Sequence, residues 1–149
     1  MTRTDLKGLS AAEMEDWAVD NGLGAYRGRQ IRHWALTRFV KSFDEMGNLP
    51  KTLRTLLKEK AHISPLREIK AVQSEDGTRK YLHQLQDGHT IETVLIPERD
   101  HLTLCISSQV GCAMNCSFCA TGKQGWVRNL QPSEIIEQVI LAKRSLEFP

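Results

Sequence analysis

Cys112-Ala-Met-Asn-Cys116-Ser-Phe-Cys119 is the stretch that decides the fold of this 149-residue chain. Its three cysteines, spaced Cys-x3-Cys-x2-Cys, can wrap one face of a metal cluster. A closed structural zinc site takes four ligands, usually from two separated pairs, and a ferredoxin-type cluster takes four cysteines at other spacings. Three ligands on a [4Fe–4S] cluster leave one iron open, so the spacing favours a cluster that binds a further, non-protein ligand.

S-adenosylmethionine can chelate such an open iron through its amino and carboxylate groups. An electron from the cluster then cleaves the sulfonium to give a 5′-deoxyadenosyl radical, and the protein's part is to position and shield the cofactor. Cys105 keeps an alternative open, because as a fourth ligand it would make the cluster a simple electron carrier. A zinc site is the other alternative. The chain start lacks the apolar segment of a secretory signal, so its four cysteines are expected to be thiols or ligands, not disulfides.

The segments on either side of this loop predict a strand before it and a helix after it. Leu102–Ile106 is short and apolar enough for a buried strand. Pro132 opens the helix, and strand, loop and helix together are the beginning of a βα unit. The helix residues expected to face inward are Ile135, Ile136, Val139 and Ile140.

Upstream of the loop, the sequence changes to the period of strands and predicts a small antiparallel meander. The pairs Asp76-Gly77 and Asp87-Gly88 are typical of hairpin turns and stand between the expected strands. The strands are expected at 66–74, 78–86 and 90–97.

The first 60 residues are expected to form a compact three-helix module. Ser10-Ala-Ala-Glu13 has the pattern of a capping box, a second helix is expected from Arg27 to Val40, and Pro50 suits the first turn of a third. The tryptophans of this module are expected to belong to its core and not to a ligand site. The residues expected to face inward are Met14, Trp17, Ala18, Ile31, Trp34, Ala35, Leu53, Leu56 and Leu57.

Charge is unevenly distributed along the chain. Between Arg27 and Lys70, eleven lysines and arginines stand against four acidic residues, whereas the remainder carries nine basic and fourteen acidic residues. The basic block suggests a polyanion partner, although a solvated basic helix surface explains it equally well. A hydrophobic content of 40% excludes a wholly disordered chain, and the lack of an 18-residue apolar run excludes a membrane-spanning helix. A cytoplasmic protein is expected.

Over nearly all of its length, the chain resembles the RlmN/Cfr family of radical S-adenosylmethionine RNA methyltransferases. The matching segments are 26–31, 43–46, 76–78, 91–94, 104–112, 120–122 and 124–130. The resemblance implies an α+β fold followed by α/β, in three parts. These are a helical RNA-binding accessory domain at 1–63, an antiparallel β meander at 64–100 and, at 101–149, the first βα unit of a radical SAM partial (β/α) barrel that is truncated here.

The resemblance also implies which residues hold the cofactors and the RNA. Cys112, Cys116 and Cys119 would ligate a [4Fe–4S] cluster that also binds S-adenosylmethionine, and Phe118 would lie next to the adenine of that cofactor. The accessory domain would grip folded RNA, with phosphate contacts expected from Arg27, Arg29, Arg32 and Lys41. Lys123 and Arg128 are further residues that can approach cofactor or RNA.

Two residues outside the loop would take part in the chemistry of this family. Cys105 would resolve a covalent protein–RNA intermediate through a transient disulfide, although by itself it reads as a buried strand cysteine. Glu92 would accept the proton from the adduct. It shares a strand face with Val94 and Ile96, so partial burial and a raised pKa are expected; the alternative is a solvated glutamate on an edge strand.

The activity implied by the resemblance is methylation of C2 of an adenine in 23S rRNA and in certain tRNAs, by a monomer that takes electrons from a donor such as flavodoxin. Methylation of adenine C8 by the same family, and a non-catalytic RNA-binding or iron–sulfur fragment, are the alternatives. All four cysteines are assigned, so none is left to carry the methyl group. The chain is therefore expected to be an amino-terminal fragment that is inactive alone.

Overall fold

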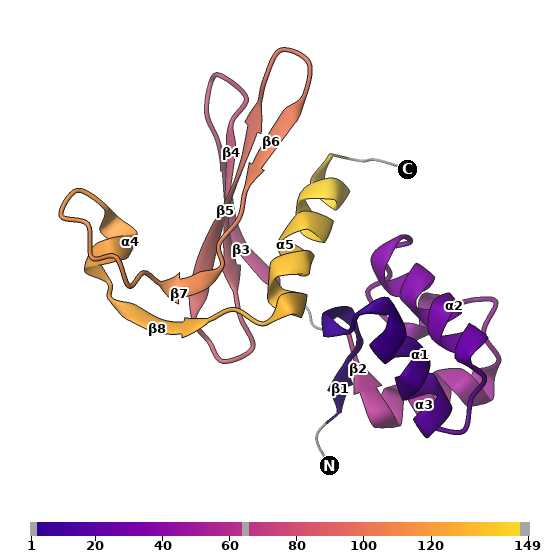
Figure 1. Ribbon diagram of the computed structural model, residues 1–149. Coiled ribbons are helices and arrows are strands. Elements are labelled where there is room, and N and C mark those ends of the chain that lie inside the picture. The colour runs from indigo at the N-terminus through magenta and orange to yellow at the C-terminus, as the bar shows by residue number, and fades with distance from the viewer. Residues whose placement is uncertain (1–2, 64–65, 147–149) are drawn as a thin grey trace. The chain divides into compact units, whose positions relative to one another are not determined.

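A computed structural model of the chain describes residues 3–63 and 66–146 (Figure 1). The chain divides into two units, Met1–Ser64 and Pro65–Pro149. The second unit holds both the expected meander and the expected start of the radical SAM core. Among the described residues, no helix combines the length and the apolar character needed to cross a membrane.

Three helices build the first unit: α1 (Ala11–Asp20), α2 (Ala25–Leu36) and α3 (Lys51–Lys60). The capping box expected at the start of α1 is confirmed, because the Ser10 hydroxyl accepts the Glu13 N–H and the Glu13 carboxylate accepts the Ser10 N–H. The expected extension of α2 to Val40 is wrong. The helix ends at Leu36, and Phe39 takes a left-handed conformation (φ 53°) that reverses the chain.

Short elements complete this unit. Two 3-10 turns, η1 (Leu6–Gly8) and η2 (Phe43–Glu45), precede α1 and α3, and the strands β1 (Thr4–Asp5) and β2 (Ala61–His62) pair in parallel. The β1–β2 pair joins the two ends of the unit, and the sequence did not predict it.

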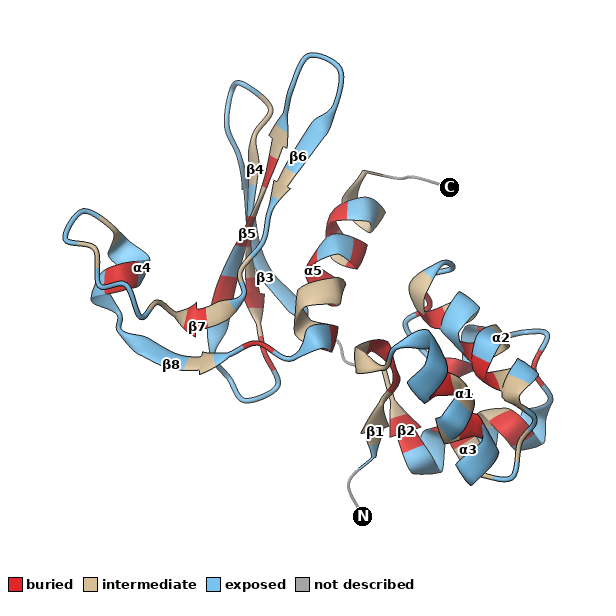
Figure 2. Ribbon diagram, viewed as in Figure 1, coloured by how far each residue is buried: buried red, intermediate tan, exposed pale blue. Residues whose placement is uncertain are grey.

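The core of the first unit lies between its helices, where Figure 2 shows the buried residues. A Cβ atom on Gly28 would lie 2.5 Å from the Met14 carbonyl oxygen, so glycine at this position lets α2 approach α1 closely. Trp17 and Trp34 pack against the core while staying partly exposed, which confirms that they belong to it. The buried cluster comprises Leu6, Met14, Ile31, Val40, Phe43, Met46, Leu49, Leu53, Leu57 and Ala61.

An antiparallel sheet forms the centre of the second unit. Its strands lie in the order β3 (Arg67–Gln73), β4 (Arg79–Gln84), β5 (Thr90–Pro97) and β6 (Leu102–Cys105). Both expected hairpin turns are confirmed, because Gly77 and Gly88 take positive φ angles of 87° and 88°.

One face of this sheet packs against helix α5 (Pro132–Ser145) (Figure 1). The Thr93 hydroxyl donates to Gln138 Oε1 at 2.9 Å, and the Tyr81 hydroxyl lies 2.8 Å from Ser145 Oγ. Since neighbouring residues of a strand point to opposite faces, the residues between these buried ones point away from α5. That second face carries the candidate site.

The expected buried strand at 102–106 is wrong with respect to burial. Strand β6 forms, but three of its four residues are exposed, because it lies at the edge of the described sheet and pairs with β5 alone. It continues the meander in the antiparallel direction. The expected combination of helices and sheets is confirmed, whereas the partial barrel stays a prediction.

The inward face expected for α5 is also partly wrong. Ile140 is buried, but Val139 is exposed, and Ile135 and Ile136 are half-buried. Glu137 and Gln138 are buried in their place. The helix is turned so that Gln138 reaches the sheet, where its amide forms hydrogen bonds that an isoleucine could not make.

Candidate active site

A cleft of about 320 Å³ lies on the sheet face that points away from α5. Its sheet wall consists of Lys80, Leu82, Glu92, Val94 and Cys105. Strand register explains why they meet: Leu82 pairs with Glu92, and Val94 pairs with both Lys80 and Cys105, so all five side chains share one face.

The other wall of the cleft comes from the two ends of the three-cysteine loop. Gly111 directly precedes Cys112, and Ala120 and Thr121 directly follow Cys119; all three line the cleft. The structure therefore brings Glu92 and Cys105 together with the base of the loop.

Glu92 is half-exposed and lies in an ion pair, in which Lys80 Nζ and Glu92 Oε1 are 2.7 Å apart. The Glu92 side chain is thus only half covered, whereas the other face of β5 buries Ile91, Thr93 and Leu95. Glu92 does share its face with Val94 and Ile96, as expected, but this face opens into the cleft. The Lys80 ammonium pairs with the carboxylate at the wall of the cleft.

Cys105 is an exposed free thiol at the end of β6. The expectation that Cys105 is buried in a strand is wrong, because β6 lies at the edge of the described sheet. All four cysteines are free thiols in the structure.

The three-cysteine loop lies in a hairpin between β7 (Gln109–Gly111) and β8 (Trp126–Asn129), with the short helix α4 (Ala120–Lys123) after it. The Cys112 N–H donates to the Gly125 carbonyl at 3.0 Å and closes the base of the loop. A Cβ atom on Gly122 would lie 2.9 Å from the Cys116 nitrogen, so glycine lets α4 pack directly on the loop backbone.

Cys119 lies at the N-terminus of α4, where backbone N–H groups point toward its sulfur. The N–H groups of Gly122 and Thr121 hold the pKa of the Cys119 thiol below its ordinary value. A depressed pKa favours the thiolate, which is the form that binds metals. The hydrogen bonds thus prepare one sulfur of the loop as a ligand.

The thiols of the loop are the type of donor that iron–sulfur clusters take. Cys112, Cys116 and Cys119 are half-buried free thiols within eight consecutive residues. Within residues 3–63 and 66–146, no three histidine, cysteine or acidic side chains are grouped tightly enough for a single metal ion. Phe118 is 90% exposed and Met114 77% exposed, so the outer part of the loop offers apolar side chains to a bound group.

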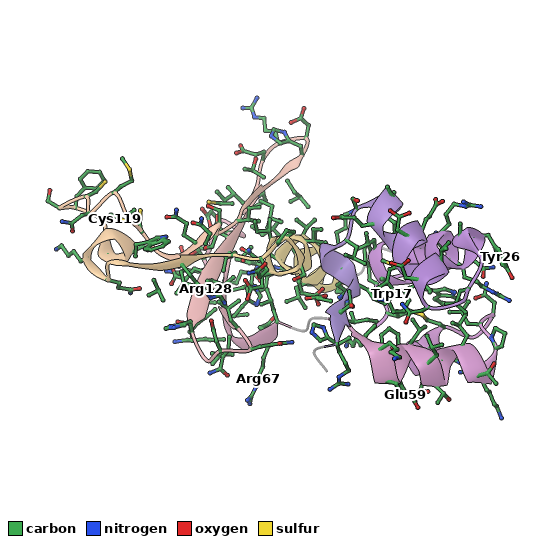
Figure 3. All side chains as sticks on the ribbon, turned by 60° about the horizontal axis from the view of Figure 1, so that its bottom comes forward. Trp17, Tyr26, Glu59, Arg67, Cys119 and Arg128 are labelled. Carbon is green, nitrogen blue, oxygen red and sulfur yellow. The ribbon has the colours of Figure 1, made fainter. Side chains whose placement is uncertain are left out.

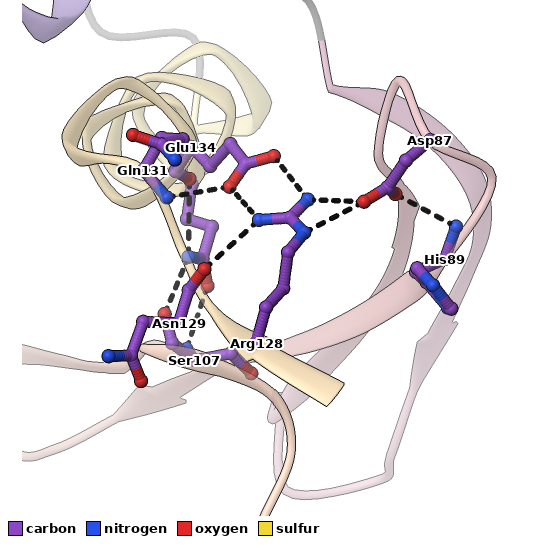
Figure 4. A network of polar contacts seen from close by, with 8 residues as sticks. Asp87, His89, Ser107, Arg128, Asn129, Gln131 and Glu134 are labelled. Carbon is purple, nitrogen blue, oxygen red and sulfur yellow. Dashed lines mark hydrogen bonds and ion pairs between the residues drawn. The ribbon is translucent and has the colours of Figure 1, made fainter. Parts of the chain in front are cut away.

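Arg128 connects the hairpin to the sheet and to α5 (Figure 4). Its guanidinium lies 2.7 Å from the Asp87 carboxylate in the β4–β5 turn and donates two hydrogen bonds of 2.9 Å to Glu134 in the first turn of α5. It also donates to the Asn129 carbonyl. Arg128 is therefore engaged in the scaffold, and its expected approach to cofactor or RNA stays a prediction.

The ionisation of these groups reflects the network. Bonds to Glu134 and then to Asp87 raise the pKa of Arg128 far above its ordinary value, although burial opposes this. For Glu134, burial acts to raise the pKa, but the bonds from Arg128 and the Gln131 N–H outweigh burial and lower it. The same balance, with bonds from Arg128 and the His89 N–H, lowers the pKa of Asp87. All three groups are charged at neutral pH.

Gln138 is a positioning residue that the sequence did not reveal. Its Oε1 accepts hydrogen bonds from the Thr93 hydroxyl and the Ser107 N–H, and its Nε2 donates to the Ser107 carbonyl at 2.8 Å. The Ser107 hydroxyl in turn donates to the Glu92 carbonyl at 2.6 Å. This chain of bonds holds the segment after Cys105 against the strand that carries Glu92. A glutamine within the isoleucine-rich segment of α5 was the only signal in the sequence.

The four residues expected to contact RNA lie in the first unit. Three come from α2: Arg27, which donates to Gln30 Oε1 at 2.7 Å, Arg29, which pairs with Glu15 at 3.1 Å, and Arg32, which is exposed. Lys41 is exposed and follows α2. All four belong to the first unit, whereas the cleft lies in the second. Their contact with RNA stays a prediction.

Comparisons with known proteins find relatives along nearly the whole chain. Residues 4–63 match the family model described as the ribosomal RNA large subunit methyltransferase N-terminal domain. The chain is 48% identical over 142 residues to the dual-specificity RNA methyltransferase RlmN of Desulfosudis oleivorans, covering 95% of this chain and 38% of that protein. It is 50% identical over 145 residues to the RlmN of Geobacter sulfurreducens, covering 97% and 40%. The chain matches the amino-terminal part of RlmN proteins.

A solved structure supports this assignment. The fold matches a radical SAM methyltransferase from Sphaerobacter thermophilus with a TM-score of 0.89 and 44% sequence identity, over 96% of this chain and 42% of that one. The expected resemblance to the RlmN/Cfr family is thus confirmed, for its amino-terminal part. The chain spans about 40% of the length of the RlmN relatives that it matches.

Proposed function

We propose that this chain supplies the accessory domain and the cluster loop of a radical SAM RNA methyltransferase. The substrate we infer is an adenine in 23S rRNA and in certain tRNAs, methylated at C2. The observation that carries the proposal is the shared cleft, in which Glu92, Cys105 and both ends of the cysteine loop line one space of about 320 Å³. A cleft of this size lies at the lower end of the range for small-molecule sites, roughly 300–1,000 Å³.

Cys112, Cys116 and Cys119 would hold a [4Fe–4S] cluster, and Phe118 would shield the adenine of S-adenosylmethionine. Together these cofactors supply the methyl group and the one-electron chemistry that activates it. The depressed pKa of Cys119 and the glycine contact of α4 with Cys116 support this role of the loop.

Glu92 would accept the proton from adenine C2, because an ionised carboxylate beside the reacting base is a competent general base. The Lys80 ammonium keeps the Glu92 carboxylate oriented in the cleft. Cys105 would release the product by attacking the methyl-bearing cysteine that links protein to RNA, which forms a disulfide. That second cysteine lies outside this stretch of sequence, so turnover belongs to the complete protein.

The proposal also defines the partners. The reaction requires an electron donor such as flavodoxin, and rRNA and tRNA substrates place the complete enzyme in the cytoplasm, where we expect it to act as a monomer. The basic side chains of the first unit would contact RNA phosphates through Arg27, Arg29, Arg32 and Lys41.

The experiment is a methylation assay of the complete protein on 23S rRNA, with mass spectrometry of the modified nucleoside. Glu92→Gln is expected to attach the methyl carbon to RNA and then stall as a covalent protein–RNA adduct. The matched control is Glu98→Gln, which alters an exposed glutamate next to β5 that does not line the cleft; it should turn over normally. Normal turnover by Glu92→Gln would remove Glu92 from the mechanism, and methylation at C8 would overturn the assignment of C2.

A further inference from the structure

Helix α2 borders a second hollow, which the proposed function does not use. This open groove of about 370 Å³ lies on the first unit. Five of its lining residues follow one stripe of α2 at helical spacing, and the sixth comes from the loop before α3. The lining residues are Tyr26, Arg29, Gln30, His33, Trp34 and Asn48.

Aromatic rings lie at both ends of the stripe. Tyr26 is 51% exposed, and Figure 3 shows it at the outside of its unit. The Arg27 guanidinium lies 4.8 Å from the centre of the Tyr26 ring, on one of its faces. Trp34 packs against the core, and its indole N–H donates to Asn48 Oδ1 at 2.6 Å, which fixes the ring at the groove wall.

The charge of α2 selects the kind of occupant. The helix carries Arg27, Arg29 and Arg32, and its sequence contains no acidic residue. Arg29 lines the groove, where its guanidinium is largely exposed although it contacts Glu15 at 3.1 Å. An occupant that is flat, aromatic and anionic matches rings, amides and guanidinium groups together.

We propose that this groove binds one unpaired nucleotide of the RNA, with its base stacked on Tyr26 and its phosphate facing Arg29. Proteins read single-stranded RNA by stacking bases on aromatic rings and by hydrogen bonds to base edges, whereas an RNA duplex keeps its bases stacked inside. The Gln30 and Asn48 amides line the groove. Because their oxygens accept from Arg27 and Trp34, their NH2 groups are the ones suited to the base edge. The proposal rests on the proposed function in one respect, namely that the substrate is RNA.

The test compares two RNA probes on the 149-residue chain: a fluorescent, unstructured hexaribonucleotide and a fluorescent 12-base-pair RNA duplex, at constant salt. Tyr26→Ala is expected to weaken binding of the hexamer about tenfold, the effect of losing one stacked base, and to leave duplex binding within twofold. Tyr26→Phe should bind like the unaltered chain. The matched control is Val19→Ala, since Val19 is an equally exposed apolar residue of the same unit (55%) that does not line the groove.

A second variant tests the phosphate contact. Arg29→Gln is expected to reduce the dependence of log K on log salt by about 0.7 for the hexamer, as the loss of one phosphate contact on a single strand predicts. Tyr26→Ala carries no change in charge and should leave that slope unchanged.

The proposal is overturned if Tyr26→Ala binds the hexamer like the unaltered chain, if it loses duplex binding equally, or if the unaltered chain does not bind the hexamer. Each of these results is independent of the methylation assay, because Tyr26 lies outside the cleft that holds Glu92 and Cys105. If the groove does not bind RNA, the reaction proposed for the complete protein is unaffected. If the methylation assay fails, the RNA-binding measurements can still be interpreted.

Discussion

Replacing Arg128 by methionine should destabilise the second unit by about 2 kcal/mol. Methionine keeps an unbranched apolar side chain but removes the guanidinium that bridges Asp87 and Glu134. Both carboxylates would then lose their charged partner, and the hairpin that carries the cysteine loop would lose the Arg128 bonds to α5 and to the β4–β5 turn.

The magnitude follows from burial. Exposed ion pairs contribute about 0–1 kcal/mol, and breaking a fully buried pair costs about 3–5 kcal/mol. The side chains of Arg128, Glu134 and Asp87 are 29%, 13% and 39% exposed, which lies between these limits. Glu134 also keeps the Gln131 N–H as a donor, at 2.7 Å, which reduces the loss. For a unit of this size, about 2 kcal/mol lowers Tm by roughly 8–16 °C.

The assay is thermal and urea unfolding of the unaltered chain, Arg128→Met and a control, Lys80→Met. Lys80 also forms an ion pair within the second unit, with Glu92, but the two side chains are 54% and 46% exposed. Its loss should cost less than about 1 kcal/mol. If the two variants unfold within about 0.5 kcal/mol of each other, Arg128 does not hold the unit together.

The pH dependence provides a second readout with a definite sign. The folded state lowers the pKa of Asp87 and of Glu134, so both carboxylates contribute stability above their ordinary pKa values, and this stability is lost as the pH falls through the folded-state values. The difference in stability between the unaltered chain and Arg128→Met should therefore be largest near pH 7 and should narrow below about pH 4. A constant difference across this range would contradict the electrostatic explanation.

Three further substitutions test the packing of each unit and the support of the loop. Gly28→Ala places a methyl group 2.5 Å from the Met14 carbonyl oxygen and should cost about 1–3 kcal/mol in chemical denaturation; full stability would mean that α1 and α2 are not in close contact. Burial lowers the pKa of His83, whose ring nitrogens have no hydrogen-bond partner among the described residues, so the unaltered chain should lose stability as the pH falls from about 6.5 toward the folded-state value. His83→Leu should abolish that loss in Tm measurements at pH 8 and pH 5, and an unchanged pH dependence would assign it to another group. Gly122→Ala brings a methyl group within 2.9 Å of the Cys116 nitrogen and should reduce iron uptake severalfold with little change in Tm, so full iron content would show that the loop adapts.

The parts of the fold that the sequence predicted depend on local rules. The capping box at Ser10 and the two hairpin turns depend only on residues that are neighbours in the sequence. The structure has them at the expected positions. The expected helix to Val40 was longer than the observed α2. The helical spacing of apolar residues does not show that Phe39 takes a positive φ. The exposure of β6 depends on its position at the edge of the described sheet, which spacing along the chain does not show.

For the candidate site, the sequence located the cysteines but not their surroundings. The Cys-x3-Cys-x2-Cys spacing is a local pattern, whereas the meeting of Glu92 with Cys105 depends on the register of β5 with β6. Arg128 and Gln138 were missed as structural residues because they bind Asp87 and Thr93, which lie 41 and 45 residues away in the sequence. Polar residues that serve several distant segments are visible only when those segments are folded together.

The roles of the four cysteines are tested by counting iron and acid-labile sulfide after anaerobic reconstitution of the unaltered chain, Cys112→Ala and Cys105→Ala. If the three loop cysteines hold a [4Fe–4S] cluster and Cys105 remains a free thiol, the unaltered chain and Cys105→Ala will each bind about four iron and four sulfide per chain, and Cys112→Ala will bind neither. Loss of the cluster in Cys105→Ala would make Cys105 a fourth ligand and the chain an electron carrier. A cluster retained by Cys112→Ala would contradict the assignment of the loop as its binding site.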